Sequence, residues 1–471
     1  MNSHNLKIIN FHDLEAVSYP IIKILGNVEV AFCQKESSGK VLLTLNGIEY
    51  STNLRDNVFK FLIELHNSKN EITVSYCCDA LNLTIQYVPK DLLNTVIPLY
   101  VICEGHDGCF QAPLKERNDP ESACKRIMLC LKLLQCVTAE KLYEHDLGRK
   151  TFQIEDNCQI FKSSVNYLDA QEMNQVQLWQ NIGKDIISNF SGSKNKKYLA
   201  FLSCTKYCGE QYIDDMKTHE ELLEITKGYV ALGGGNLALF GTASLFTWPE
   251  QFDDVINRFE DMTPIDRTQF LDDSCYRGTV GACFSTTLGS VLHELYHTFD
   301  LGHSKDGIMG RGFDNIGKVF TNSQMCKSFS FHNKIEFKEQ LSTCSLKDVE
   351  KSIKKDFTVI RRTEEVDDTL LTKSCAVLLS FHRWFNNYPN QSSHLSFDSS
   401  NKVVKSTAGV RVVEIRQVDD ELILYSWVFV SKVLKFSFQI PEDVLNELNN
   451  QNLIILVEDS VGCILKEEFV A

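Results

Sequence analysis

The stretch that decides the fold is HELYHTFDLGH, which runs from His293 to His303. On a helix, His293 and His297 lie one turn apart on the same face, so both imidazoles can reach one metal ion. Glu294 can then reach a water molecule bound to that ion. His303 lies about 600° of helical rotation beyond His297, so it returns to the metal only if the helix has ended first. The spacing predicts a zinc hydrolase site with an open fourth position.

The residues around the motif favour a helix that lines a cleft. Leu288, Leu292, Leu295 and Phe299 are spaced 4, 3 and 4 apart and predict a core-facing stripe beside the histidine face. The alternative is a surface helix with scattered histidines. By composition, HExxH arises by chance in about 2% of such chains, and a third histidine lowers that figure to under about 0.1%. We therefore expect one buried side and one side that faces a cleft.

Composition limits the classes of partner and compartment. The chain has 471 residues, 43% of them hydrophobic, and a formal net charge of -14, which argues against nonspecific binding to nucleic acid or anionic membranes. Its N-terminal residues lack the features of a signal peptide, and no apolar run approaches the roughly 18 residues that span a bilayer. We expect a cytoplasmic or nuclear protein. The 17 cysteines are scattered and odd in number, which indicates reduced thiols.

The chain is expected to have an α+β fold with three domains. Segments rich in β-branched residues, such as KVLLTLNGIEY and IPLYVICEG, predict an N-terminal β-sandwich-like domain over residues 1–110. An amphipathic helix from Glu121 to about Leu147, capped by Asp119, opens a catalytic domain over residues 111–390. Period-two alternation returns in segments such as GVRVVEIRQV, and predicts a small C-terminal β-sandwich-like domain over residues 391–471.

A glycine-rich segment precedes the histidine helix. The run from Gly233 to Gly235 resembles a phosphate loop, but no GK[ST] follows and no helix opens directly after it. We expect a turn that leads into a strand beside the cleft. In several zinc peptidases, the strand on this rim pairs with an extended peptide substrate through its backbone groups.

The motif and the bend after it carry a family resemblance. HExxHxxxxxH followed by SKDGIMGRGFDNIG resembles the metzincin clan of zinc peptidases, in which a methionine-containing turn follows the third histidine. Within that clan, GACFSTTLGSVLHELYHTFDLGHSKDGIMGRGFD resembles a little-characterised family of fungal and animal proteins described as zinc metallopeptidases. The resemblance extends from Ile97 to Asn387, through segments such as ALGGGNLALFGTASLFTWP. It implies a metzincin-like catalytic domain, with a mixed sheet and an active-site helix.

The resemblance also implies roles for individual residues. It assigns Zn²⁺ ligation to His293, His297 and His303, and the general base to Glu294. It assigns structural support beneath the metal to Met309. The clan has glycine where this chain has Asp300, so an aspartate must make the turn after the helix, with Gly302 available to share the task.

Several residues have alternative interpretations. Asp300 could replace His303 as a ligand, and Glu336 or Glu339 could supply a glutamate ligand instead. Cys283 could be a latent zinc thiolate, although a core thiol is favoured. Tyr296 is expected in the cleft wall. Two further cysteines, Cys204 and Cys208, form a lone CxxxC pair for which a structural zinc is the less favoured reading.

The expected function is a zinc-dependent metallopeptidase, and more specifically an endopeptidase that acts on a protein or peptide substrate. Glu294 would activate the water that attacks the peptide carbonyl. One alternative is a zinc-binding but catalytically silent module that uses its β domains for protein interaction. Another is a β-domain interaction protein with a vestigial site. The intact Glu294 favours the enzyme.

Overall fold

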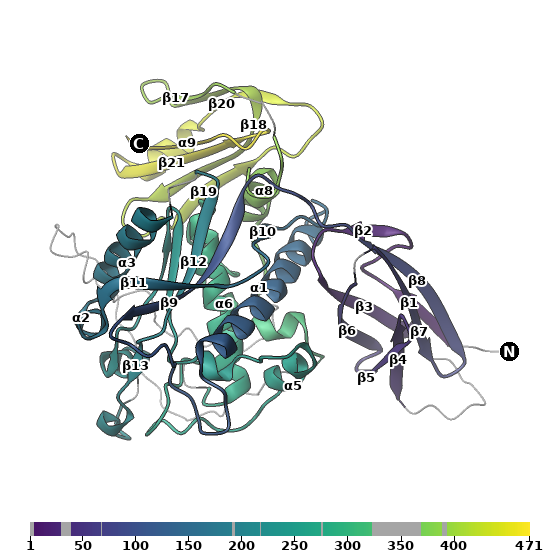
Figure 1. Cartoon of the computed structure of the whole chain (residues 1–471). Coiled ribbons are helices and arrows are strands. Elements are labelled where there is room, and N and C mark those ends of the chain that lie inside the picture. Colours follow the sequence, from purple (N-terminus) through teal and green to yellow (C-terminus); the bar gives the residue numbers. More distant parts are fainter. Residues whose placement is uncertain are drawn as a thin grey trace. The chain divides into compact units, whose positions relative to one another are not determined.

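The computed structural model describes residues 4–29, 39–66, 68–190, 194–216, 218–274, 277–322, 369–388 and 393–471. These residues form an α+β protein with several sheets (Figure 1). They belong to two compact units, which are taken in turn. As far as they are described, the first holds residues 1–300, 313–325 and 384–387, and the second holds 301–312, 326–383 and 388–471. The expected three-domain division stays a prediction.

The N-terminal residues of the first unit form two sheets, as their β-branched composition predicted. The three-stranded sheet is antiparallel, in the order β1-β3-β6, and the five-stranded sheet has the order β2-β8-β7-β4-β5. Burial alternates along strands such as β4, because one side of each strand faces a core. The strands are β1 (Asn5–Ile8), β2 (Glu15–Val17), β3 (Ile21–Glu29), β4 (Lys40–Leu45), β5 (Ile48–Asn53), β6 (Val58–Glu64), β7 (Ser68–Tyr76) and β8 (Asp79–Tyr87).

A six-stranded mixed sheet forms the centre of the first unit, in the order β10-β9-β12-β16-β15, with β11 also paired to β9. All its pairs are parallel except β15 with β16, so β15 is an antiparallel edge strand. The strands are β9 (Thr95–Glu104), β10 (Gln153–Ile154), β11 (Gln159–Asn166), β12 (Lys196–Leu202), β15 (Ala231–Gly234) and β16 (Leu237–Gly241).

The position of β9 corrects the sequence analysis, which grouped IPLYVICEG with the N-terminal strands. The strand is buried along almost its whole length, and it pairs in parallel with β10, β11 and β12. Burial on both faces is typical of a parallel strand covered by helices on each side. The continuous apolar run was therefore the sign of a central strand.

Helices cover both faces of the central sheet (Figure 1). The helices α2 (Tyr167–Glu172) and α3 (Gln175–Asn189) share a buried apolar cluster with alternate residues of β9, β12 and β16. On the other face, α1 (Pro120–Tyr143) contacts β9, and α6 (Val280–Thr298) contacts β15 and β16. Asp119 caps α1 as predicted, since its carboxylate accepts the N–H of Ser122 at 3.0 Å.

Short elements complete the first unit between the strands and α6. The elements are β13 (Lys206–Tyr207), η1 (Gly209–Gln211), α4 (His219–Glu224), β14 (Thr226–Lys227), η2 (Leu245–Thr247), η3 (Phe252–Asp254), α5 (Val255–Phe259) and, after α6, η4 (Gly312–Val319). Two of them, β13 and α4, contribute Tyr207 and Leu222 to a small buried cluster that also includes Leu271.

The second unit contains one six-stranded antiparallel sheet, in which β18 pairs with β17, β19, β20 and β21, and β21 pairs with β22. The expected sandwich-like form is therefore wrong for the described C-terminal residues. The apolar face is covered by helical residues such as Val444 and Leu448, which take the place of a second sheet. The elements are α8 (Lys373–Phe381), β17 (Leu395–Asp398), β18 (Val403–Gln417), β19 (Ile423–Val428), β20 (Lys435–Gln439), α9 (Glu442–Leu448), β21 (Asn452–Asp459) and β22 (Ile464–Val470).

In the part of the chain that the structure describes, none of the helices has both the length and the apolar character required to cross a membrane.

Candidate metal centre

The helix α6 is anchored by the apolar stripe that its sequence predicted. Leu288, Leu292, Leu295 and Phe299 are all fully buried. Gly289 lies on a crowded part of the helix, where an added Cβ would come within 2.0 Å of the carbonyl oxygen of Phe313. Only glycine permits so close an approach between the two backbones. Packing on these residues fixes the orientation of the histidine face.

The first two histidines lie on adjacent turns of α6, as the spacing predicted. Their Nε2 atoms are 3.1 Å apart, so both rings direct the same nitrogen toward one point. The His293 ring packs against Phe313, with ring centroids 5.2 Å apart. This contact restricts the ring before any ion binds, which lowers the conformational entropy lost on binding.

The helix ends at Thr298, before the third histidine, as the rotation argument required. Asp300 adopts the left-handed conformation, with φ of 63°, and this confirms that an aspartate makes the turn where the clan consensus has glycine. Gly302 has a different role, because its backbone approaches other residues closely. A Cβ at that position would lie 2.5 Å from the carbonyl oxygen of Glu421 and 2.8 Å from Nε of Arg416.

His303 is held from both its backbone and its ring. Its carbonyl oxygen accepts the N–H of Ile423 at 2.9 Å, and its Nδ1–H donates to the carbonyl oxygen of Asp420. Because Nδ1 carries the proton in that hydrogen bond, the lone pair of the neutral ring is on Nε2. Metal-ligating histidines are commonly fixed in this way by a carbonyl group.

One nitrogen from each of His293, His297 and His303 lies within 4.8 Å of the other two. Tetrahedral zinc with Zn–N bonds of about 2.0–2.1 Å requires nitrogens about 3.4 Å apart, so small side-chain shifts are sufficient. Three neutral imidazoles are also a ligand set known from catalytic zinc sites. The residues therefore fit a zinc ion.

The alternative ligands considered in the sequence analysis each have a separate outcome. Asp300 is absent from the group that the three histidines form. Glu336 and Glu339 lie outside the described residues. Within the described ranges, Cys204 and Cys208 belong to no group of three potential ligands, and both thiols are buried.

Glu294 is held by the edge strand of the central sheet, a contact that the sequence analysis did not predict. The N–H of Gly233 in β15 donates to Oε2 of Glu294 at 2.7 Å. Burial raises the pKa of Glu294 to about 8, and the Gly233 hydrogen bond opposes that rise. The sequence contains one sign of this contact, the glycine run from Gly233 to Gly235. Such a run indicates that another backbone comes close, but it does not identify Glu294 as the partner.

Gly233 allows β15 to lie directly against α6. An added Cβ would fall 2.0 Å from the carbonyl oxygen of Glu294. Two residues earlier, the N–H of Ala231 donates to Oε1 of Gln175 at 3.0 Å. Both N–H groups therefore bind side chains of the same chain, and a substrate strand could use them only after Gln175 and Glu294 had moved.

Three other predicted residues are placed as follows. Met309 is buried, and its carbonyl oxygen accepts the N–H of Ser304, which closes the loop that directly follows His303. Its position beneath a metal stays a prediction. Tyr296 is not in a cleft wall: it is fully buried, and its hydroxyl lies 2.9 Å from Oγ1 of Thr138 in α1. Cys283 is a core thiol, and burial raises its pKa.

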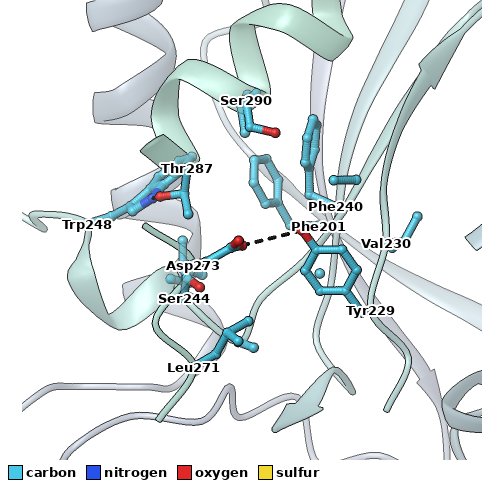
Figure 2. A pocket seen from close by; sticks show the side chains of 15 residues that line it. Phe201, Tyr229, Val230, Phe240, Ser244, Trp248, Leu271, Asp273, Thr287 and Ser290 are labelled. Atoms are coloured by element: carbon cyan, nitrogen blue, oxygen red, sulfur yellow. Dashed lines mark hydrogen bonds between the residues drawn. The ribbon is translucent and has the colours of Figure 1, made fainter. Parts of the chain in front are cut away.

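A small cavity lies beside α6, on the N-terminal side of the first histidine (Figure 2). Its volume is about 40 Å³, and its lining includes Ala231 of β15 and Ser290 and Val291 of α6. Figure 2 shows Tyr229 and Asp273 on another side, where the tyrosine hydroxyl lies 3.5 Å from Oδ2 of the aspartate. The cavity has room for one small side chain.

Comparison with known proteins places the chain in a family. The family model Metallopep, described as "Putative peptidase family", matches residues 5–370. The chain belongs to this family, which confirms the resemblance to a little-characterised family of zinc metallopeptidases. The metzincin-like fold of the catalytic domain stays a prediction.

Similar proteins carry related names. One from Saccharomyces cerevisiae, named "Putative zinc metalloproteinase", is 23% identical over 354 residues, which cover 68% of this chain and 49% of the relative. One of the same description from Schizosaccharomyces pombe is 27% identical over 246 residues, covering 47% and 38%. The chain thus spans about half the length of the first relative and less of the second.

A solved structure with partial similarity is that of catalytically inactive OgpA from Akkermansia muciniphila in complex with an O-glycopeptide substrate. The match covers 81% of this chain and 93% of that chain, with 15% identity and a TM-score of 0.42.

Proposed function

We propose that this chain is a zinc-dependent endopeptidase with a metzincin-like site, in which His293, His297 and His303 hold the metal and Glu294 is the general base. The observation that carries the proposal is the convergence of three imidazole nitrogens, with Glu294 next to the first of them in the chain. Membership of a peptidase family supports the same reaction class.

The chain's own residues have separate tasks in this reaction. When bound, zinc would polarise the peptide carbonyl and acidify a water molecule. Glu294 accepts a proton from the attacking water and delivers it to the nitrogen of the leaving amine. The N–H of Gly233 keeps the carboxylate in place, and the carbonyl oxygen of Asp420 keeps the Nε2 lone pair of His303 available.

The substrate is an extended peptide that passes beside β15, with one small side chain in the cavity next to α6. The cavity is lined by Ser290, which lies one helical turn before His293, and by Ala231 on the edge strand. Its volume of about 40 Å³ fits a small side chain and excludes an aromatic one. Cleavage sites in a peptide library, mapped by mass spectrometry, are expected to share a small residue at one fixed position next to the scissile bond.

The decisive test is Glu294→Gln in the full chain. The amide cannot accept the water proton, so we expect kcat for casein or peptide cleavage to fall by about 10²- to 10⁴-fold. Zinc content should stay unchanged, because the three histidines remain. The matched control is Glu121→Gln, an exposed carboxylate on α1, which should cleave at the wild-type rate.

Two results would overturn the proposal. Equal cleavage by Glu294→Gln and the wild type would remove Glu294 from the mechanism. Zinc bound by a wild-type chain that cleaves no peptide in the library would favour the catalytically silent interaction module.

A further inference from the structure

We propose a second zinc site in the N-terminal β structure, formed by His4, Cys77 and Cys78. One ligand atom from each residue lies within 4.8 Å of the other two. The proposal uses none of the residues of the histidine site, and it does not depend on the proposed peptidase activity.

The two cysteines make up the loop of the hairpin between β7 and β8. Tyr76 pairs with Asp79, so Cys77 and Cys78 are the two residues that connect the strands. Cys77 has a φ of 54°, in the left-handed region that glycine and asparagine enter most readily. Loops of this length favour Asn-Gly for that reason. A thiol that occupies such a position at a cost in backbone strain indicates a role for the sulfur atom.

Two contacts hold the chain near His4 against this loop, one on each side of the two cysteines. Its ring packs edge-on against the ring of Tyr76, with centroids 5.2 Å apart, and only 6% of the residue is exposed. Two residues later, the N–H of Leu6 donates to Oδ2 of Asp79 at 2.8 Å. His4 and the start of β1 are therefore held against the hairpin at Tyr76 and Asp79, which flank the two cysteines.

The chemical types of the ligand atoms indicate which metal ion the site would bind. Thiolate and imidazole are ligands for zinc and other soft or borderline ions, whereas calcium and magnesium prefer oxygen. With Zn–S bonds of about 2.3 Å and Zn–N bonds of about 2.0–2.1 Å, tetrahedral ligand atoms lie about 3.5–3.8 Å apart. The observed grouping within 4.8 Å needs only small side-chain shifts to reach that geometry. Two thiolates also neutralise the charge of a divalent ion, and a water molecule completes the tetrahedron.

Such a site would tie together the two N-terminal sheets. His4 directly precedes β1 of the three-stranded sheet, while Cys77 and Cys78 connect two strands of the five-stranded sheet. These residues are far apart in the sequence, so a metal bridge closes a long loop of the unfolded chain. Zinc binding at this position should therefore contribute to folding stability.

Cobalt substitution distinguishes this site from the histidine site, because only thiolate ligands give the intense sulfur-to-cobalt absorption in the near ultraviolet. We expect the full chain, stripped of metal and titrated with Co²⁺, to show this absorption. It should be lost in Cys77→Asn/Cys78→Gly, a pair that suits the same loop and preserves the fold. Zinc content should fall from about two ions per chain to about one. Cys463→Ser, in the connection between β21 and β22, is the matched control and should retain the absorption.

The histidine site is removed separately by His293→Ala/His297→Ala. In that background the thiolate absorption should persist, and zinc should raise Tm more in the protein with intact cysteines than in Cys78→Ser. A wild-type chain that shows the thiolate absorption but cleaves no peptide would contradict the proposed function alone. The second site would be refuted by absorption that survives Cys77→Asn/Cys78→Gly, or by a wild-type chain that gives no absorption and carries a Cys77–Cys78 disulfide by mass spectrometry.

Discussion

At residue 233, hydrogen is the only side chain that fits between β15 and α6. Gly233→Ala would place a Cβ 2.0 Å from the carbonyl oxygen of Glu294, so the strand must move away from the helix. We expect a loss of about 1–3 kcal/mol in the free energy of unfolding. We also expect a fall in kcat of at least about tenfold, because the N–H that orients Glu294 moves with the strand. Urea denaturation and peptide cleavage measure the two effects.

The neighbouring glycine provides the control for this prediction. A Cβ on Gly234 meets no atom within 4 Å, so Gly234→Ala should leave both stability and kcat close to the wild type. If the two variants behave alike, the close contact of Gly233 with Glu294 has no role in positioning the carboxylate.

The end of α6 is the element whose geometry brings His303 back toward the first two histidines. Asp300 makes this turn at a φ of 63°, where glycine is unstrained and β-branched residues are strongly disfavoured. Asp300→Gly should keep its zinc, whereas Asp300→Val should lose about 1–2 kcal/mol of stability and bind zinc at least about tenfold more weakly. Zinc competition with a chromophoric chelator measures the affinity. Equal affinity in Asp300→Val would show that the turn does not depend on the left-handed conformation.

At the scale of elements, sequence patterns predicted what depends on local periodicity. The helix that carries His293 and His297 follows from its apolar stripe, and its end before His303 follows from the rotation per residue. The sequence could not show that Tyr296 faces Thr138 in α1, because helix periodicity does not identify the neighbour of each face. The hydrogen bond from Gly233 to Glu294 was missed for the same reason, since it joins two elements far apart in the chain.

Local sequence patterns likewise could not identify which strands pair with one another. A run such as IPLYVICEG is compatible with an antiparallel sandwich or a central parallel strand, and only its burial on both faces separates the two. The C-terminal strands alternate as predicted, but alternation does not state whether a helix or a second sheet covers the apolar face. Here residues of α9 cover it.

Over the whole first unit, one buried carboxylate connects α1 to the N-terminal strands. Glu140 lies 2.8 Å from Nε of Arg149 and 3.7 Å from Nζ of Lys23, and it accepts a hydrogen bond from Asn10 at 2.8 Å. Its side chain is only 3% exposed. Glu140→Gln removes the carboxylate that pairs with two buried cations, Lys23 and Arg149, of which Arg149 keeps its ion pair with Glu15. We expect a loss of about 3–5 kcal/mol in the free energy of unfolding, measured by urea denaturation.

The control for this network is Glu121→Gln in the first turn of the same helix. Glu121 pairs with Lys125 at 2.8 Å, and the two side chains are 68% and 44% exposed, so solvent screens the pair. Its loss should leave the free energy of unfolding close to that of the wild type. Equal destabilisation by the two variants would mean that the Glu140 network does not join α1 to the strands.

The occupied edge of β15 has a further consequence for how these molecules behave in concentrated solution. An exposed edge strand with unsatisfied N–H groups is a template for intermolecular sheet growth and aggregation. In β15, Gln175 and Glu294 bind the N–H groups of Ala231 and Gly233. The carboxylate proposed for catalysis therefore also occupies a hydrogen-bonding position of that edge, and Glu294→Ala would leave the N–H of Gly233 without this acceptor.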